Sequence, residues 1–199
     1  MTTRRVLIFL LGSVAMAQPL SFGVRGGVPF TGPFADAAGT VGVQTSSGSN
    51  AYAVGPMIEL HLPLGFSVEA DALYHPLHMI QQINTGTILA RNPYTYMSWE
   101  FPILAKYRFL HLPLVKPYVE AGPSFRAVSS SLSYFSKSGL TVGAGVELKL
   151  SRLRIEPELR YTRWRSDMVL TEGEAAGLVV VSTVPSNTNQ AQFLVGIAF

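Results

Sequence analysis

The sequence predicts an all-β fold, an eight-stranded antiparallel up-and-down β-barrel that spans a membrane. Three observations lead to this prediction. Apolar and polar residues alternate along eight segments, the connections between segments alternate between long and short, and eight of the twelve acidic residues lie on the polar faces. Charged residues make up 14% of the 199 residues, against roughly 25% in a typical soluble domain, and the length suits a single domain.

The first seventeen residues are typical of a secretory signal peptide. Arg4 and Arg5 provide a positive start, residues 6–14 an apolar core, and residues 15–17 (Ala-Met-Ala) a cleavage pattern. The core is shorter than the roughly 20 residues that span a bilayer, so we expect cleavage and a barrel domain over residues 18–199. No later apolar run reaches the length of a membrane helix, which leaves a soluble exported protein or a membrane barrel.

From Leu20 onward the chain alternates with a period of two, as strands with two different faces do. The eight segments cover residues 20–30, 52–62, 66–75, 98–109, 118–126, 140–150, 153–162 and 190–199. In chain order, their apolar faces include Phe22 and Val24, Ile58 and Leu60, Val68 and Ala70, Phe101 and Ile103, Val119 and Phe125, Val142 and Ala144, Leu159 and Tyr161, and Val195 and Ile197. A length of about ten residues suits a tilted membrane strand.

Three prolines fall inside these segments, at Pro102, Pro123 and Pro157. Because proline removes a donor from the hydrogen-bond ladder of a sheet, we expect bulges or shifts of face beside them.

The connections between the segments alternate in length. Residues 31–50, 76–95, 128–138 and 165–189 form long connections, whereas those after the second, fourth and sixth segments are short. Long loops on one side and short turns on the other are typical of outer-membrane barrels, with both termini on the periplasmic, short-turn side. Residues 44–50 and 182–190 are small and polar, and we expect mobile, solvent-facing extracellular loops there.

Charge placement separates a membrane barrel from a soluble lipocalin-like barrel, which alternates in the same way but turns its apolar face inward. The polar faces carry eight acids and seven bases, and this near balance favours ion pairs in a confined lumen because unpaired charges away from water are costly. We therefore predict a lumen charge network of Arg25, Glu59, Glu69, Asp71, Glu100, Lys106, Arg108, Glu120, Arg126, Glu147, Lys149, Arg154, Glu156, Glu158 and Arg160. Since an eight-stranded barrel is only wide enough for side chains, we expect this network to fill the lumen.

Two stretches carry a resemblance to a known family. Residues 99–107 read Trp-Glu-Phe-Pro-Ile-Leu-Ala-Lys-Tyr, and residues 117–125 read Pro-Tyr-Val-Glu-Ala-Gly-Pro-Ser-Phe. With them, residues 18–199 resemble the outer-membrane β-barrel domain family often called PorT-like, a relative in architecture of the OmpA transmembrane domain. The resemblance implies a location in the bacterial outer membrane. It also implies that Phe199, the last residue, is the assembly signal recognised by the barrel assembly machinery.

Catalytic and metal-binding alternatives have weaker support in the sequence. A lipid hydrolase needs a nucleophile, a base and an orienting acid within reach, and His61 and His111 fall at the short turns, away from the outer rim. His75 and His78 lie three residues apart and suggest a surface metal site, but no further ligand is evident. Glu156 and Glu158 have a spacing compatible with glycoside chemistry, yet a filled lumen gives a sugar no access.

We therefore expect a non-enzymatic structural or interaction protein of the outer membrane, without catalytic residues, cofactor or metal. A narrow channel or small-solute transporter is the alternative, and a lipid-modifying enzyme is the second alternative. The expected partners are outer-membrane lipids and, during biogenesis, the barrel assembly machinery. No basic run is present to bind nucleic acid, and we expect a monomer.

Overall fold

The computed structural model describes residues 20–32, 37–38, 43–47, 51–84, 89–110, 112–128, 137–150, 153–165, 168–175, 178–185 and 187–199. The predicted signal peptide, residues 1–17, lies outside the described residues, as does His111. The described part of the chain contains no helix of the length and apolarity that a membrane crossing requires.

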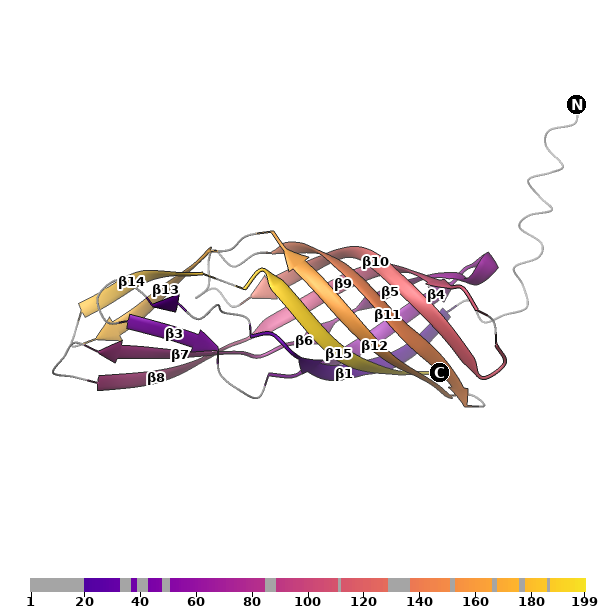
Figure 1. The fold of residues 1–199 in the computed structure, drawn as a ribbon, viewed down its shortest axis with the longest axis horizontal. Coiled ribbons are helices and arrows are strands. Elements are labelled where there is room, and N and C mark those ends of the chain that lie inside the picture. Colours follow the sequence, from indigo (N-terminus) through magenta and orange to yellow (C-terminus); the bar gives the residue numbers. More distant parts are fainter. Residues whose placement is uncertain are drawn as a thin grey trace, which may run out of the picture.

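The predicted segments form the strands of a closed antiparallel barrel (Figure 1). These strands are β1 (Leu20–Pro29), β4 (Ala53–His61), β5 (Phe66–Asp71), β6 (Leu73–Tyr74), β9 (Ser98–Arg108), β10 (Val115–Val128), β11 (Ser138–Leu150), β12 (Leu153–Trp164) and β15 (Asn189–Ala198). Their order around the barrel is β1, β15, β12, β11, β10, β9, β5 and β4, and β4 pairs with β1 to close it. Strands β5 and β6 both lie between β4 and β9 and together form one strand of the wall, so the prediction of eight strands is confirmed.

The break between β5 and β6 has a local cause in β4. Pro56 lies opposite Ala72, and it accepts a hydrogen bond from the Ala72 backbone N at 3.0 Å. Proline has no N–H to return, so Ala72 drops out of the ladder. Met57 pairs with Asp71 and Val54 pairs with Tyr74, so the register is the same on both sides of the break.

The expected bulges at the other prolines are absent from the paired, described strands. Ala121 pairs with Ala105 and Ser124 pairs with Pro102, so the register is unchanged across Pro102 and Pro123. Pro157 pairs with Val195 in an unbroken ladder between β12 and β15. The prediction of bulges was wrong because each of these prolines costs one donor without inserting a residue.

The long connections carry strands of their own. Strands β2 (Ala37–Ala38), β3 (Val43–Ser47), β7 (Leu77–Asn84) and β8 (Leu89–Tyr96) form a four-stranded sheet, and β13 (Met168–Ala175) pairs with β14 (Leu178–Pro185). In Figure 1 these elements lie beyond one end of the barrel, and the C-terminus lies toward the other. The expectation of loops at residues 44–50 and 182–190 is corrected where residues 44–47 and 182–185 belong to paired strands.

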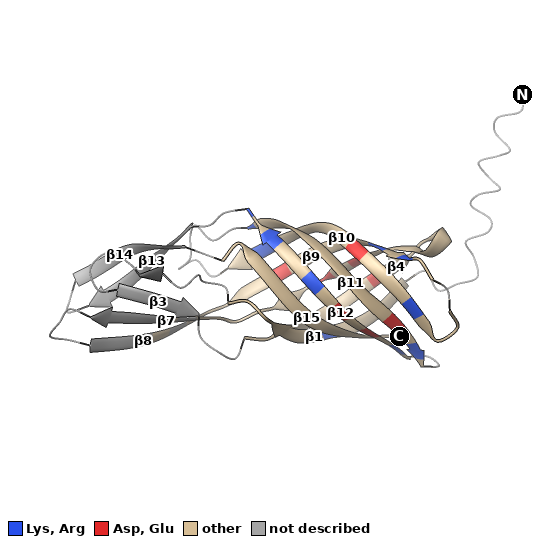
Figure 2. Cartoon of the chain, in the orientation of Figure 1, with Lys and Arg blue, Asp and Glu red and all other residues tan. Residues whose placement is uncertain are grey.

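The two faces of the barrel wall are inverted relative to a soluble barrel. In β9 every second residue from Ser98 to Arg108 is buried and every residue between them is exposed. The exposed positions are apolar, with Phe22 58% and Ile103 45% exposed, whereas charged residues of the same strands are buried. Charges are spread along the barrel strands in Figure 2. This arrangement matches a membrane barrel with a polar lumen and excludes the lipocalin-like alternative.

Because neighbouring strands approach closely at Gly27 but not at Gly26, we predict that alanine substitutions at these two residues differ sharply in their effect on stability. A Cβ added at Gly27 would lie 1.9 Å from the Phe193 carbonyl oxygen, whereas one at Gly26 has its nearest neighbour at 3.6 Å. We expect Gly27→Ala to lower the free energy of unfolding by about 3 kcal/mol because β1 and β15 must separate. Gly26→Ala is the matched control and should change it by less than about 0.5 kcal/mol. Urea titration in detergent micelles measures both, and equal stability of the two variants would contradict the strand spacing.

Candidate functional site in the barrel lumen

The candidate site is the set of charged residues inside the barrel. Of the fifteen residues predicted from the sequence, fourteen are buried, and each is at most 9% exposed. Lys149 is the exception, because its side chain is exposed near the end of β11 and makes no ion pair with a described residue. Lys116 on β10 instead contributes a cation, with Nζ 3.0 Å from Glu147 Oε1. With this exchange, the described lumen still combines eight acids with seven bases.

Lys106 lies at the centre of the network. Its Nζ donates hydrogen bonds to Glu69 Oε2 at 2.5 Å and Glu156 Oε2 at 2.9 Å. It also lies 3.9 Å from Glu59 Oε1 and 4.3 Å from the centroid of the Tyr118 ring. An ammonium inside a low-dielectric interior is stable only when such partners replace its water.

Two arginines extend this middle layer across the barrel. Arg25 on β1 donates from Nη1 to Asp71 Oδ2 at 3.0 Å and from Nη2 to Glu69 Oε2 at 3.0 Å. Arg160 on β12 donates to Asp71 at 2.8 Å, to Glu120 at 3.0 Å and to Glu69 at 3.1 Å. The β5 carboxylates Glu69 and Asp71 are therefore shared by guanidinium groups from β1 and β12, which ties opposite walls together.

A second layer lies toward the short turns. Arg108 donates to Glu59 at 2.6 Å and to Glu147 at 2.7 Å, and Ser67 donates to Glu59 at 2.6 Å. Arg154 Nη1 lies 3.4 Å from Glu59 Oε2. These contacts join strands β4, β5, β9, β11 and β12 just inside the rim.

A third layer lies toward the long connections. Arg126 Nη2 donates to Glu100 Oε1 at 2.7 Å, and its guanidinium carbon lies 3.7 Å from the centroid of the Trp164 ring. Gln190 donates to both carboxylate oxygens of Glu100 at 3.1 Å, and the Trp164 indole N–H donates to Gln190 at 2.7 Å. His75 Nδ1 lies 3.1 Å from Glu100 Oε1. A cation stacked on an aromatic ring and a carboxylate with several hydrogen-bond donors therefore form the layer at this end of the lumen.

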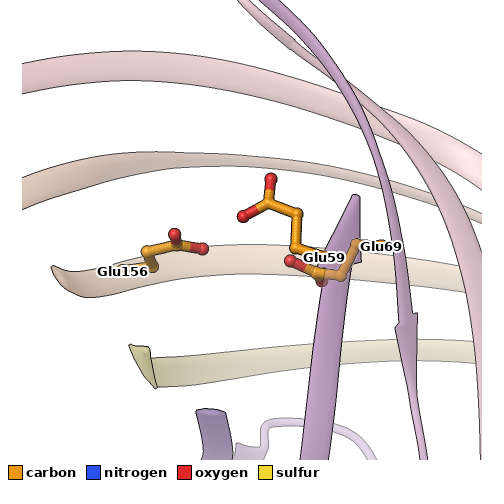
Figure 3. Close-up of side chains that lie close together, drawn as sticks. All are labelled: Glu59, Glu69 and Glu156. Carbon is orange, nitrogen blue, oxygen red and sulfur yellow. The ribbon is translucent and has the colours of Figure 1, made fainter. Parts of the chain in front are cut away.

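The strand register explains one unfavourable neighbour pair. Glu59 and Glu69 lie directly opposite each other on β4 and β5, where like charges repel. Figure 3 shows the side chains of these residues and Glu156 gathered in one part of the lumen. One oxygen from each of the three lies within 4.8 Å of the others, which is the spacing of ligands around a cation. Lys106 Nζ lies in contact with two of them, so the protein's own ammonium provides that positive charge.

Sequence reasoning identified the charges but missed several partners. Lys116, Tyr118 and Gln190 all lie on inward-facing positions of their strands, and Tyr118 donates to Glu158 at 2.8 Å. The alternation that placed Glu120 in the lumen extends to Lys116, four residues earlier on the same face, so this residue was detectable. The alternation also gives Gln190 an inward position, but nothing in the sequence marked Gln190 or Trp164 as partners in the charge network, because both side chains are neutral.

The histidines make separate contacts. His75 lies beside Glu100, whereas His78 Nδ1 lies 3.0 Å from Thr95 Oγ1. Neither belongs to a group of converging metal-type ligands among the described residues. His61 Nε2 lies 2.5 Å from Arg154 Nη1 and 3.8 Å from Glu59 Oε2. The pair His75 and His78 therefore does not assemble the surface metal site considered from the sequence.

Removal of the central ammonium should destabilise the barrel strongly. Lys106→Met keeps the length of the side chain but removes the ammonium that contacts both Glu69 and Glu156, and leaves Arg25 as the cation between them. We expect a loss of about 3 to 5 kcal/mol in the free energy of unfolding, measured by urea titration in detergent micelles. Adding Glu156→Gln should recover part of the loss. Lys149→Met, at an exposed cation, is the control, and a Lys106→Met variant as stable as this control would refute the central role of Lys106.

Comparisons with known proteins agree with this geometry. A family model described as "Outer membrane protein beta-barrel domain" matches residues 16–163. Among solved structures, the outer membrane protein OprG from Pseudomonas aeruginosa is 14% identical and superposes with a TM-score of 0.61, covering 90% of this chain and 92% of that one. Neisserial surface protein A is 15% identical with a TM-score of 0.52, covering 91% and 96%. At these identities the likeness concerns the fold, and the comparison with curated proteins gave no significant match.

Proposed function

The chain belongs to the family of outer membrane protein β-barrel domains, and on this basis we propose that it is a non-enzymatic structural or interaction protein with a closed lumen. Its location is the bacterial outer membrane, in line with the family and with similar solved barrels. The observation that carries the proposal is the stack of three ion-pair layers inside the barrel.

The layers support a closed lumen for an energetic reason. An open path would require the separation of buried partners in every layer, for example Arg108 from Glu59, Lys106 from Glu69 and Arg126 from Glu100. Each separation leaves buried charges without partners, at a cost of about 3 to 5 kcal/mol. The lumen of an eight-stranded barrel offers little room for water to replace the lost contacts.

The arrangement of potential catalytic groups supports a role without enzymatic activity. Hydrolysis needs a base next to a nucleophile and open to substrate. His75 is buried against Glu100, and His61 contacts the guanidinium of Arg154. His78 lies beside the Thr95 hydroxyl, but no described acid is paired with this histidine to orient it as a base. The charged groups of the described lumen are engaged with one another, and the strands beyond the barrel end, β2, β3, β7, β8, β13 and β14, provide the surface for interaction.

Planar-bilayer recording tests the closed lumen. We expect the purified, refolded protein to insert without producing conductance steps, while a known porin in the same bilayer conducts. Heat-modifiable migration on a gel confirms that the inserted sample is folded. Stable conductance steps from the folded wild-type protein would overturn the proposal and favour the narrow channel.

We also propose that Phe199 acts as the assembly signal recognised by the barrel assembly machinery. Its side chain is 71% exposed on the outer face, and its backbone N donates to the Phe22 carbonyl oxygen at 3.0 Å. The side chain thus adds little to packing within the barrel and is accessible to a partner.

The proposal predicts that a change at Phe199 affects assembly more than stability. We expect Phe199→Ser to reduce the amount of folded protein in outer membranes several-fold in cells, measured by fractionation and heat-modifiable migration. Refolding of the purified variant into micelles should give a free energy of unfolding within about 1 kcal/mol of wild type, because few contacts are lost. Phe109→Ser, at another exposed aromatic residue near the same rim, is the control. Equal losses in both variants would contradict a specific signal.

A further inference from the structure

Two arginines break the rule that charges face the lumen. Arg163 lies on β12 on the same outward face as Leu159 and Tyr161, and Arg165 follows just beyond the strand. Among the side chains that the structure describes, these are the charged ones on the outward wall of the barrel. Both lie at the end with the long connections, where Arg165 N donates to the Ser138 carbonyl oxygen at 3.1 Å. An outward cation at a membrane rim is costly unless an anion or the head-group region receives it.

The two arginines line a hollow at this rim. Residues from the start of β11 and the chain before β15 complete it, including Ser138, Leu140 and Thr188. Arg163 Nη1 donates to Asn189 Oδ1 at 2.5 Å, an oxygen that also accepts from the Tyr161 hydroxyl at 2.6 Å. The partner of Arg163 is therefore a neutral amide, and a guanidinium carries five N–H donors. Its charge has no carboxylate partner among the described residues.

An apolar groove runs down the wall from this hollow. It crosses β11, β12 and β15 and is lined on its outward side by Val142, Ala144, Leu159, Tyr161 and Ala191. Ala144 pairs with Leu159 across one ladder, and Ala191 pairs with Tyr161 across the next. Small side chains beside large ones leave an apolar furrow in the surface.

The hollow and the groove lie next to each other along β11 and β12. On β11, Leu140 lines the hollow and Val142 lines the groove. On β12, Arg163 lines the hollow and Tyr161 lines the groove. Residues two apart on one strand face are separated by roughly 6.6 to 6.8 Å. A ligand that occupies both must carry negative charge at the rim and an apolar chain directly below it.

We propose that this surface is a binding site for a phosphorylated, acylated lipid of the membrane leaflet at that rim. Arginine binds phosphate through two parallel hydrogen bonds, and Arg163 and Arg165 present this chemistry at head-group depth. Lys137 is exposed at the same rim and adds a third cation. The groove along Val142 and Ala144 takes an acyl chain, so one lipid satisfies both the charge and the apolar surface. This site is separate from the lumen and does not depend on whether the lumen conducts.

Native mass spectrometry of the full, detergent-solubilised protein tests the site. The probe is diphosphoryl lipid A, compared with the monophosphoryl form and with inorganic phosphate alone. We expect retention of the diphosphoryl lipid, weaker retention of the monophosphoryl form and none of phosphate. The double variant Arg163→Gln with Arg165→Gln should weaken retention by about tenfold or more, because charge-assisted hydrogen bonds are lost. Lys149→Gln, at the opposite rim, should leave it unchanged.

A second pair of variants tests the groove without a change of charge. Ala144→Phe should weaken retention because the ring fills the furrow, whereas Ala105→Phe, at an exposed outward alanine on β9, should not. Folding of every variant is checked by heat-modifiable migration. Equal retention by wild type and the double arginine variant would overturn the proposal. So would equal retention after Ala144→Phe, or binding of inorganic phosphate alone at the same concentration, which would indicate a plain anion site.

Discussion

The contact between Lys106 and the carboxylates of Glu69 and Glu156 is the interaction on which the rest of the barrel depends. A membrane barrel must turn its apolar side chains to lipid, so its polar side chains meet inside the lumen. The Lys106 ammonium lies between Glu59, Glu69 and Glu156, which come from three different strands. Glu59 and Glu69 face each other directly across β4 and β5. Lys106 lies near both carboxylates, and with Arg108 on Glu59 and Arg25 on Glu69 it offsets the repulsion of this pair.

The same constraint accounts for the glycines of the lumen face. A Cβ at Gly143 would lie 2.6 Å from Glu120 Oε1, and one at Gly145 would lie 2.5 Å from the Tyr118 hydroxyl. Gly196 leaves room in the same way for Arg25, because a Cβ at Gly196 would lie 3.2 Å from Arg25 Nη2. Long charged side chains from one strand therefore occupy the space that the neighbouring strand leaves empty. The alternation of small and charged residues in the sequence therefore reflects the volume available in the lumen as well as its polarity.

Strand number, pairing and the facing of charges could be predicted from the sequence because each rests on a period of two. Errors arose where the period gives no information. Lys149 has inward parity, yet it lies at the rim and extends to solvent, while Lys116, at an equivalent rim position, reaches Glu147. The position of a residue in the alternation gives the face of the strand on which it lies, but not how far it lies from the rim of the barrel. The proline positions were misjudged because a lost donor does not require an inserted residue. The strands in the long connections were not predicted because apolar and polar residues do not clearly alternate there.

The charged side chains of the described lumen are buried and engaged with one another, whereas the apolar side chains of the outer wall are exposed. On the outer wall, lipid contact favours apolar residues, so a charged residue that faces outward calls for an explanation. Arg163 is such a residue, whereas β12 places its other bases, Arg154 and Arg160, in the lumen with acidic partners. Within one strand, then, the inward arginines have acidic partners in the protein, whereas the outward Arg163 donates to the neutral amide of Asn189.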